Sequence, residues 1–190
     1  MQTLIFNGSP REDGDTVFLI NELKSRLTGA VTVVNTHRSS IAPCCDCRYC
    51  WKHPSCRIDD EMQAVYEQIK ACDNIVIASP VYFSELTGML LAVMSRLQAF
   101  YAAKRFLGVT PVTKKKRGAL LLCGGGDGAP ERAVATAKTL LRLMNAELTS
   151  TVCSLNTDVT PSRADEDTLG QIVKLAAALN ESSGRDTDTI

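Results

Sequence analysis

Short apolar runs rich in Val, Ile and Leu alternate along this chain with longer segments in which apolar residues recur at helical spacing. The short runs predict five β-strands, at residues 3–6, 31–34, 74–78, 119–123 and 150–155. The longer segments predict five helices, at about 16–27, 62–69, 88–101, 130–144 and 169–179. Residues 75–78 are apolar without interruption, as expected of a parallel strand that is covered on both faces.

This order of elements predicts an α/β fold, a three-layer and doubly wound five-stranded parallel sheet. The domain is expected to span residues 1–182, with a cysteine-rich insertion at 43–57. The polar residues 183–190 are expected to form a disordered tail. Ligands of such sheets bind at the carboxyl ends of the strands, so the loops after strands one, three and four are the first places to look for a site.

The composition is ordinary for a globular protein, with 45% hydrophobic and 22% charged residues. The 21 basic and 21 acidic residues balance, which argues against a general attraction to nucleic acid or to an anionic membrane. The one basic block, at 114–117, is expected to be a solvated loop before a strand. We find no apolar stretch of about 18 residues and no signal-peptide pattern, and we therefore expect a cytoplasmic protein with reduced thiols.

The loop after the first predicted strand has the chemistry of an anion site. Ser9 and Thr16 offer hydroxyls, Arg11 offers a charge, and the following helix start offers free N–H groups. This set suits a single phosphate monoester, whereas the triphosphate motif G-x4-G-K-[ST] is absent from the sequence. The alternative is a plain polar turn that begins a helix.

Two further loops are expected at the same edge of the sheet. Residues 79–84 contain Tyr82 and Phe83, which suit contact with a flat ring, although both aromatic side chains could instead lie in the core or at an interface. Residues 124–126 are three glycines that allow the backbone to approach a ring closely. They also resemble a dinucleotide fingerprint loosely, but that fingerprint normally follows the first strand.

Four cysteines have the spacing C-x2-C-x2-C-x5-C, at Cys44, Cys47, Cys50 and Cys56. The first three can face one [4Fe–4S] cluster, and the fourth is near enough to complete its ligands. Zinc is the rival, because four thiolates also form a closed structural site, but zinc loops more often use two separated C-x2-C pairs. An ordered loop of thiols without metal is the third alternative. Cys45 is expected to be a bystander beside a ligand, with replacement of Cys44 as the alternative. The remaining cysteines are expected in the core: Cys72, Cys123 and Cys153.

Three motifs follow the predicted strands in a fixed order: N-G-S-P-R at 7–11, S-P-V-Y-F at 79–83 and G-G-G at 124–126. Together they resemble the NAD(P)H-dependent FMN reductases of the flavodoxin-like fold, and the cysteine loop makes the chain look most like the iron–sulfur flavoproteins of that group. The resemblance runs from residue 1 to about residue 180. It departs from the family at Leu91 and Ser95-Arg96, where family members often have Lys and Asp-Arg, so family contacts along helix 88–101, subunit contacts included, are not carried over.

The resemblance implies FMN as the cofactor and NAD(P)H as the co-substrate. It implies that the FMN phosphate is held by Ser9, Arg11 and Thr16. It implies that the isoalloxazine is lined by Pro80, Val81, Tyr82 and Phe83, and closed on its other side by Gly124, Gly125 and Gly126. A [4Fe–4S] cluster would be held by the four cysteines named above.

The function implied is an FMN-dependent oxidoreductase that takes electrons from NAD(P)H or a protein donor. It would pass them to a small acceptor or through the cluster, and no catalytic side chain is required because the cofactor carries the chemistry. The partners implied are a small-molecule acceptor or a redox protein, and a homodimer or homotetramer. The alternatives are a flavodoxin-like electron carrier without its own substrate and a zinc-stabilised interaction domain.

Overall fold

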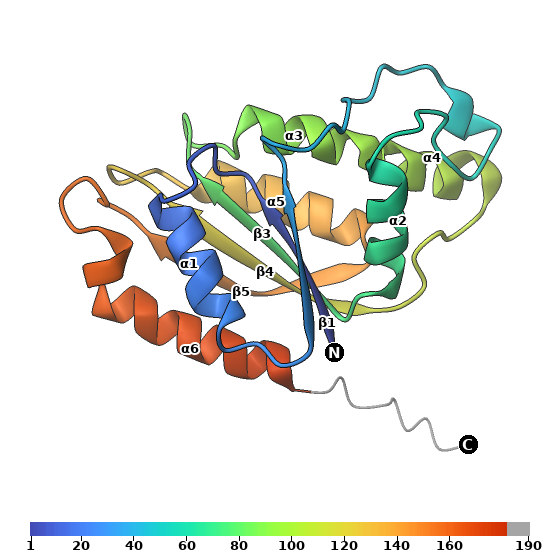
Figure 1. Ribbon diagram of the computed structural model, residues 1–190. Helices are drawn as coiled ribbons and strands as arrows, with labels where there is room; N and C mark the ends of the chain where they lie inside the picture. The colour runs from blue at the N-terminus through green and yellow to red at the C-terminus, as the bar shows by residue number, and fades with distance from the viewer. Residues whose placement is uncertain (182–190) are drawn as a thin grey trace.

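Five parallel strands form the central sheet of the protein, in the order β2-β1-β3-β4-β5 (Figure 1). The structure, a computed structural model, describes residues 1–181, so the predicted tail at 183–190 lies outside the described residues. The strands are β1 (Gln2–Asn7), β2 (Ala30–Asn35), β3 (Asn74–Pro80), β4 (Lys116–Cys123) and β5 (Ala146–Ser154). This strand order is that of flavodoxin-like folds, and it confirms the predicted α/β class.

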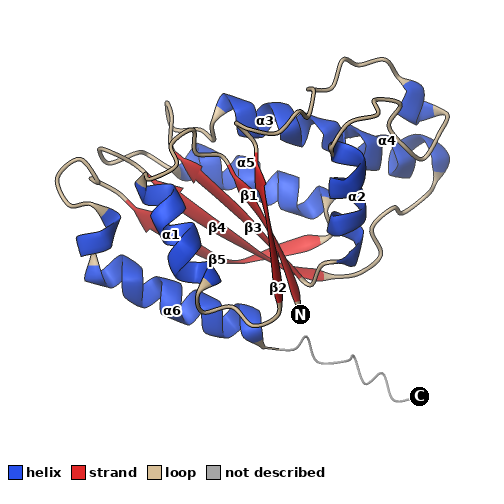
Figure 2. Cartoon of the chain, in the orientation of Figure 1, coloured by secondary structure: helices blue, strands red, loops and turns tan. Residues whose placement is uncertain are grey.

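Helices cover both faces of the sheet (Figure 2). The α-helices are α1 (Asp15–Lys24), α2 (Met62–Ala71), α3 (Gly88–Met94), α4 (Gln98–Leu107), α5 (Glu131–Leu143) and α6 (Glu166–Asn180). Three short 3₁₀ turns are η1 (Tyr49–Trp51), η2 (Ser95–Leu97) and η3 (Ser162–Ala164). None of the helices within residues 1–181 combines the length and the apolar character needed to cross a membrane.

The sheet separates two hydrophobic cores, because successive side chains of a strand point to opposite faces. Leu4 and Phe6 of β1 pack with helices α2 to α5, whereas Ile5 packs with α1 and α6. The same alternation holds in β3, with Ile75 and Ile77 on the first face and Val76 and Ala78 on the second. A strand with a core on each side has no polar face, which explains the uninterrupted apolar run.

The prediction of one helix over 88–101 was wrong. The chain forms α3 and α4, joined by the 3₁₀ turn η2 at Ser95–Leu97. Both segments bury apolar side chains, so the hydrophobic period continues across the break and does not reveal it. The residues at the break have specific contacts: Tyr66 Oη donates a hydrogen bond to the Arg96 carbonyl (2.7 Å), and the Arg96 side chain is fully buried.

The prediction of a solvated loop at 114–117 was wrong for its second half. Lys116 and Arg117 begin β4, and Lys116 is buried. Its Nζ donates to the carbonyl of Lys114 (2.6 Å), while Lys114 itself pairs with Asp73 (2.7 Å). The charge pattern alone does not mark where a strand starts.

Helix α6 has a side-chain cap whose loss has a measurable cost. Asp165 accepts hydrogen bonds from the Thr168 hydroxyl (2.6 Å) and the Thr168 N–H (3.0 Å), and these bonds hold the pKa of Asp165 below its usual value of 3.8. We expect Asp165→Ala to lower the free energy of unfolding by about 1 kcal/mol at pH 7. Because the folded-state pKa is lowered, the contribution is present above pH 3.8 and disappears as the pH falls through the folded-state value.

Denaturant unfolding of both proteins at pH 7 and at pH 2 measures this difference. Asp167→Ala, which removes an exposed acid from the same helical turn, serves as the control. A difference between the wild type and Asp165→Ala that is the same at both pH values would contradict the capping assignment.

Candidate functional site

A cavity of about 200 Å³ lies at the carboxyl ends of β1, β3 and β4. It brings together seven of the ten residues predicted to bind the cofactor: Ser9, Arg11, Thr16, Pro80, Val81, Tyr82 and Gly125. The other three, Phe83, Gly124 and Gly126, do not line it. Three loops that are distant in the sequence therefore meet at one place, as the sheet topology requires.

The loop after β1 is fixed by its own polar groups. The Asn7 side chain accepts a hydrogen bond from the Ser9 N–H (2.9 Å) and donates one to the Asn35 side chain (2.9 Å). The Ser9 hydroxyl bonds both the N–H and the carbonyl of Arg11 (3.2 Å each). A Cβ at Gly8 would lie 2.9 Å from the Thr87 hydroxyl, so a larger residue at position 8 would collide with Thr87. The result is a rigid polar turn that leads into α1.

The start of α1 can receive an anion. Gly14 is the N-cap residue, and no side chain within residues 1–181 caps this end, so the first N–H groups of the helix keep their capacity to bind a ligand. Thr16 is buried at this end, and the exposed side chain of Arg11 supplies a positive charge beside it. Hydroxyls, one cation and a free helix start fit a phosphate monoester.

The loop after β3 presents an aromatic side chain to the cavity. The N–H of Val81 donates to the carbonyl of Cys123 (2.7 Å), which ties this loop to the end of β4. Tyr82 and Glu85 exchange two backbone hydrogen bonds across a tight turn whose central residues, Phe83 and Ser84, have φ of 53° and 65°. The turn leaves Phe83 97% exposed and outside the cavity lining, so its proposed contact with a ring stays a prediction.

The glycine loop after β4 is joined to the loop after β5. The N–H groups of Asn156, Thr157 and Asp158 donate to the carbonyls of residues 126, 124 and 125. A Cβ at Gly125 would lie 2.5 Å from the Asp158 carboxylate, so a larger residue at position 125 would displace the Asp158 side chain from its present position.

The sequence analysis missed several residues that line the cavity: Pro10, Gly14, Asp15, Cys123, Thr157 and Asp158. Thr157 and Asp158 could have been found from the sequence, because they follow a predicted strand whose carboxyl end lies at the same edge of the sheet. Cys123 was assigned only to the core. Burial raises its pKa to about 11, so it is a neutral thiol at the wall of the cavity.

The four cysteines of the insertion line one small hollow, together with Cys45 and the side chain of Arg96. Cys50 is affected by all of the others: burial raises its pKa first, and the charges of Cys44, Cys56 and Cys47 raise it further. Within residues 1–181, however, no three Cys, His, Asp or Glu side chains are gathered closely enough for a single metal ion. A tetrahedral zinc would draw its sulfurs to within about 4 Å of one another. The four cysteines therefore share a hollow without the close grouping that a single bound metal ion requires.

Aromatic stacking attaches the cysteine loop to α4. Trp51 of the loop stacks on Phe106 with ring centroids 4.3 Å apart, and the Arg48 guanidinium lies 5.0 Å from the Trp51 ring. The His53 ring stacks on the Tyr49 ring with centroids 4.1 Å apart. This contact explains the position of the His53 side chain without a bound metal. The loop is therefore an ordered element that rests on the helix layer.

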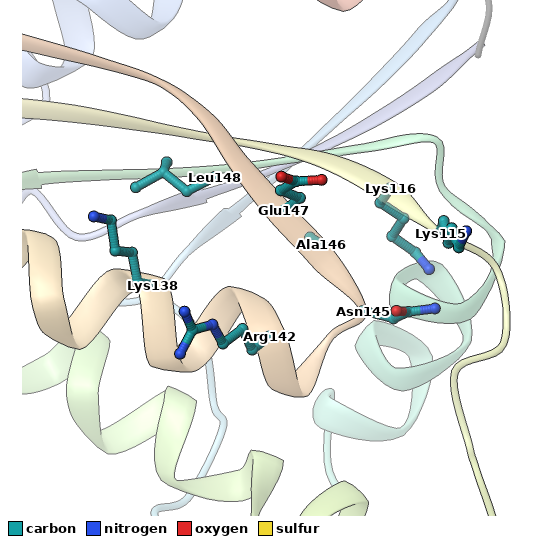
Figure 3. Close-up of a pocket in the computed structure, with 8 residues that line it drawn as sticks. All are labelled: Lys115, Lys116, Lys138, Arg142, Asn145, Ala146, Glu147 and Leu148. Atoms are coloured by element: carbon teal, nitrogen blue, oxygen red, sulfur yellow. The ribbon is translucent and has the colours of Figure 1, made fainter. Parts of the chain in front are cut away.

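A larger cavity, of about 540 Å³, lies at the opposite end of the sheet, where β4 and β5 begin (Figure 3). Figure 3 shows Lys138 and Arg142 extending from α5, with Lys115 and Lys116 at the start of β4. None of the three loops described above reaches this cavity. The smaller cavity is the candidate site for two reasons. It is lined by residues predicted to bind a phosphate and a flat ring, and it lies at the carboxyl ends of the strands, where sheets of this kind bind their ligands.

Comparison with known proteins identifies relatives of this chain. The model of the NADPH-dependent FMN reductase family matches residues 1–158 of this chain. An iron-sulfur flavoprotein of Archaeoglobus fulgidus is 41% identical over 100 residues, covering 51% of each chain. An iron-sulfur flavoprotein of Methanocaldococcus jannaschii is 32% identical over 143 residues, covering 72% of this chain and 68% of the relative. The chain spans about half the length of several of the curated relatives that it matches.

Solved structures show the same fold at low sequence identity. An NAD(P)H:quinone oxidoreductase from Methanothermobacter marburgensis superposes with a TM-score of 0.74 at 13% identity, covering 97% of this chain and 98% of that one. An FMN-dependent NADH-azoreductase from Bacillus anthracis, solved with FMN, has a TM-score of 0.69 at 16% identity, covering 95% of this chain and 100% of that one. The strand order, the converging loops and the match over residues 1–158 lead to one assignment: this chain belongs to the NADPH-dependent FMN reductase family.

Proposed function

We propose that this protein is an FMN-dependent oxidoreductase that takes electrons from NAD(P)H. The observation that carries the proposal is the meeting of the β1, β3 and β4 loops around one cavity, with the polar and aromatic groups that a flavin mononucleotide requires. Membership of the FMN reductase family and a structural neighbour solved with FMN support the same cofactor.

Each part of the cavity would contact a different part of the cofactor. Ser9, Arg11 and Thr16, with the start of α1, would bind the phosphate. Pro80, Val81 and Tyr82 would lie against the ring, and the backbone at Gly125 would approach from the other side. Bound FMN would supply the chemistry of hydride acceptance and of one- or two-electron release. The protein's own part is to bind the phosphate and to orient the ring.

We further propose that Cys44, Cys47, Cys50 and Cys56 hold a [4Fe–4S] cluster through which electrons leave the flavin. The shared hollow and the spacing C-x2-C-x2-C-x5-C support this proposal. The curated relatives that carry the name iron-sulfur flavoprotein support it as well. The acceptor beyond the cluster, a small molecule or a redox protein, belongs to the same proposal, as do a homodimeric or homotetrameric assembly and a cytoplasmic location.

One preparation tests these points together. Protein purified anaerobically should show flavin absorption, about four iron and four sulfide per chain, and bleaching of the flavin bands on addition of NADH or NADPH. A flavin that neither nucleotide bleaches would contradict the reductase and favour an electron carrier that depends on a protein donor. Flavin without iron would remove the cluster, and a colourless protein containing zinc would overturn the whole proposal.

A further inference from the structure

Arg96 has the most unusual environment of any charged residue that the structure describes. Its side chain has no exposed surface, and it is the largest fully buried side chain within residues 1–181. Burying a guanidinium is costly unless partners satisfy its charge and its N–H groups. The identity of those partners therefore indicates what the residue is for.

The partners all come from the two ends of the cysteine loop. Arg96 Nη1 donates to the carbonyl of Ala42 (2.9 Å) and to the Asp60 carboxylate (2.6 Å), and Nη2 donates to the carbonyl of Ile58 (3.2 Å). The Asp60 carboxylate also accepts from the N–H of Ala42 (3.0 Å) and of Met62 (3.0 Å). One ion pair thus joins the segment that enters the loop to the segment that leaves it. We call these two residues, Arg96 and Asp60, the clasp.

The neighbouring residue extends the same contact into the cysteine motif. The Ser95 hydroxyl accepts a hydrogen bond from the N–H of Cys44 (2.9 Å), so the first of the four cysteines is tied to η2. The break between α3 and α4 places Ser95 and Arg96 together against the loop. The interruption of the helix and the contacts with the loop thus occur at the same residues.

The other end of α3 is fastened to the flavin cavity. Thr87, the N-cap residue of α3, donates from its hydroxyl to the carbonyl of Gly8 (2.8 Å) and from its N–H to the Ser79 hydroxyl (3.2 Å). Ser95 lies eight positions after Thr87 in the sequence, which corresponds to about 12 Å along a helix. Helix α3 therefore connects the phosphate loop at one end with the cysteine loop at the other.

Arg96 also has an unused donor. Arg96 is among the residues that line the cysteine hollow, and its Nε is buried without a hydrogen-bond partner among residues 1–181. A buried N–H without a partner is uncommon, and each case calls for an explanation. A sulfur-rich anion bound in the hollow would supply both an acceptor for this N–H and a negative charge for the guanidinium.

We propose that Arg96 and Asp60 are positioning residues, which close the base of the cysteine loop and hold it on α3 at a fixed separation from the flavin cavity. The inference rests on the proposed function only in naming an iron–sulfur cluster as the group held by the loop. Arg96 has a second role toward that group: its charge stabilises the more negative, reduced form and so raises the reduction potential.

The test compares Arg96→Met, Arg96→Lys and Asp60→Asn with the wild type. Arg132→Met is the control, because Arg132 is an exposed arginine on α5 that does not line the cysteine hollow. Hydrogen exchange of residues 42–60 is the first readout, and FMN per chain shows whether the fold is kept. We expect Arg96→Met and Asp60→Asn to speed exchange in this segment about tenfold or more, as for loss of a buried ion pair, with FMN content unchanged.

The second readout concerns the cluster. Arg96→Met should lower the iron and sulfide recovered after anaerobic reconstitution by half or more, and the remaining cluster should have a more negative reduction potential. Arg96→Lys keeps the charge but has its three donors on one nitrogen, whereas the three hydrogen bonds of Arg96 come from two. It should therefore speed exchange while leaving the potential closer to that of the wild type.

Two results would overturn the proposal: unchanged exchange at residues 42–60 in Arg96→Met, or a similar acceleration in Arg132→Met. If Arg96→Met does not fold, the exchange of Arg96→Lys and Asp60→Asn decides the question. A wild type without iron would refute the cluster of the preceding section but not the clasp, because exchange and the rate of thiol labelling at residues 44–56 would still report it.

Discussion

Replacing Cys50 by Ser should reduce bound iron from about four atoms per chain to fewer than one, with FMN still present. Cys50 lines the same hollow as its three proposed fellow ligands, Cys44, Cys47 and Cys56. A serine hydroxyl is a poor ligand at neutral pH, whereas a thiolate binds iron strongly. Iron and sulfide assays together with the visible spectrum of the anaerobic protein measure the effect.

Cys45→Ser is the matched control for this experiment. Cys45 lies in the same loop and lines the same hollow, but it is exposed and falls outside the C-x2-C-x2-C-x5-C spacing. It should keep its iron. Loss of iron in Cys45→Ser but not in Cys44→Ser would show that Cys45 takes the place of Cys44, and full iron content in Cys50→Ser would refute the ligand set.

Reversing the charge at Arg11 should weaken FMN binding about hundredfold. The charge-assisted hydrogen bond to the phosphate would be lost, and Glu would place a negative charge beside it. Arg11 lines the cavity next to the uncapped start of α1, where a carboxylate would also compete for the free N–H groups. Titration of apoprotein with FMN, followed by quenching of flavin fluorescence, gives the dissociation constant of Arg11→Glu.

Riboflavin provides the internal control, because it has the same ring without the phosphate. Its affinity should change less than threefold in Arg11→Glu, and Arg132→Glu should change neither affinity. An equal loss for FMN and riboflavin would mean that Arg11 acts on the ring or on the fold of the loop. In that case the phosphate would have to be bound elsewhere.

Local periodicity was sufficient to predict the sheet and most of the helices. A strand such as β3, with Ile75 and Ile77 in one core and Val76 in the other, can be recognised because burial on both faces leaves an apolar run in the sequence. The loop chemistry at the carboxyl edge followed from the same topology. Seven of the predicted cofactor residues therefore line one cavity although they come from three separate segments.

Features that depend on contacts between distant residues were not predictable in this way. The break at η2 is apolar on both sides, and it coincides with the contacts of Arg96 with Ala42, Ile58 and Asp60. The placement of Phe83 outside the cavity depends on a tight turn with positive φ, which Phe-Ser does not signal. Asp158 reaches the cavity because its loop is hydrogen-bonded to the glycine loop. A single sequence contains no pattern for the break at η2 or for the turn at Phe83, and for Asp158 it indicates only a place at the carboxyl edge of the sheet.

The clasp has a consequence for how this fold can change over evolutionary time. Ala42 and Asp60 are bonded to each other and to the same guanidinium, so the two ends of the insertion meet at its base. Once the ends are held together, the entropy of closing the segment between them changes only slowly with its length. Residues 43–57 could then be shortened, lengthened or exchanged for another sequence while the sheet and the flavin loops keep their positions. Because the clasp holds the two ends of the insertion together, the segment between them can be replaced without changing the rest of the fold.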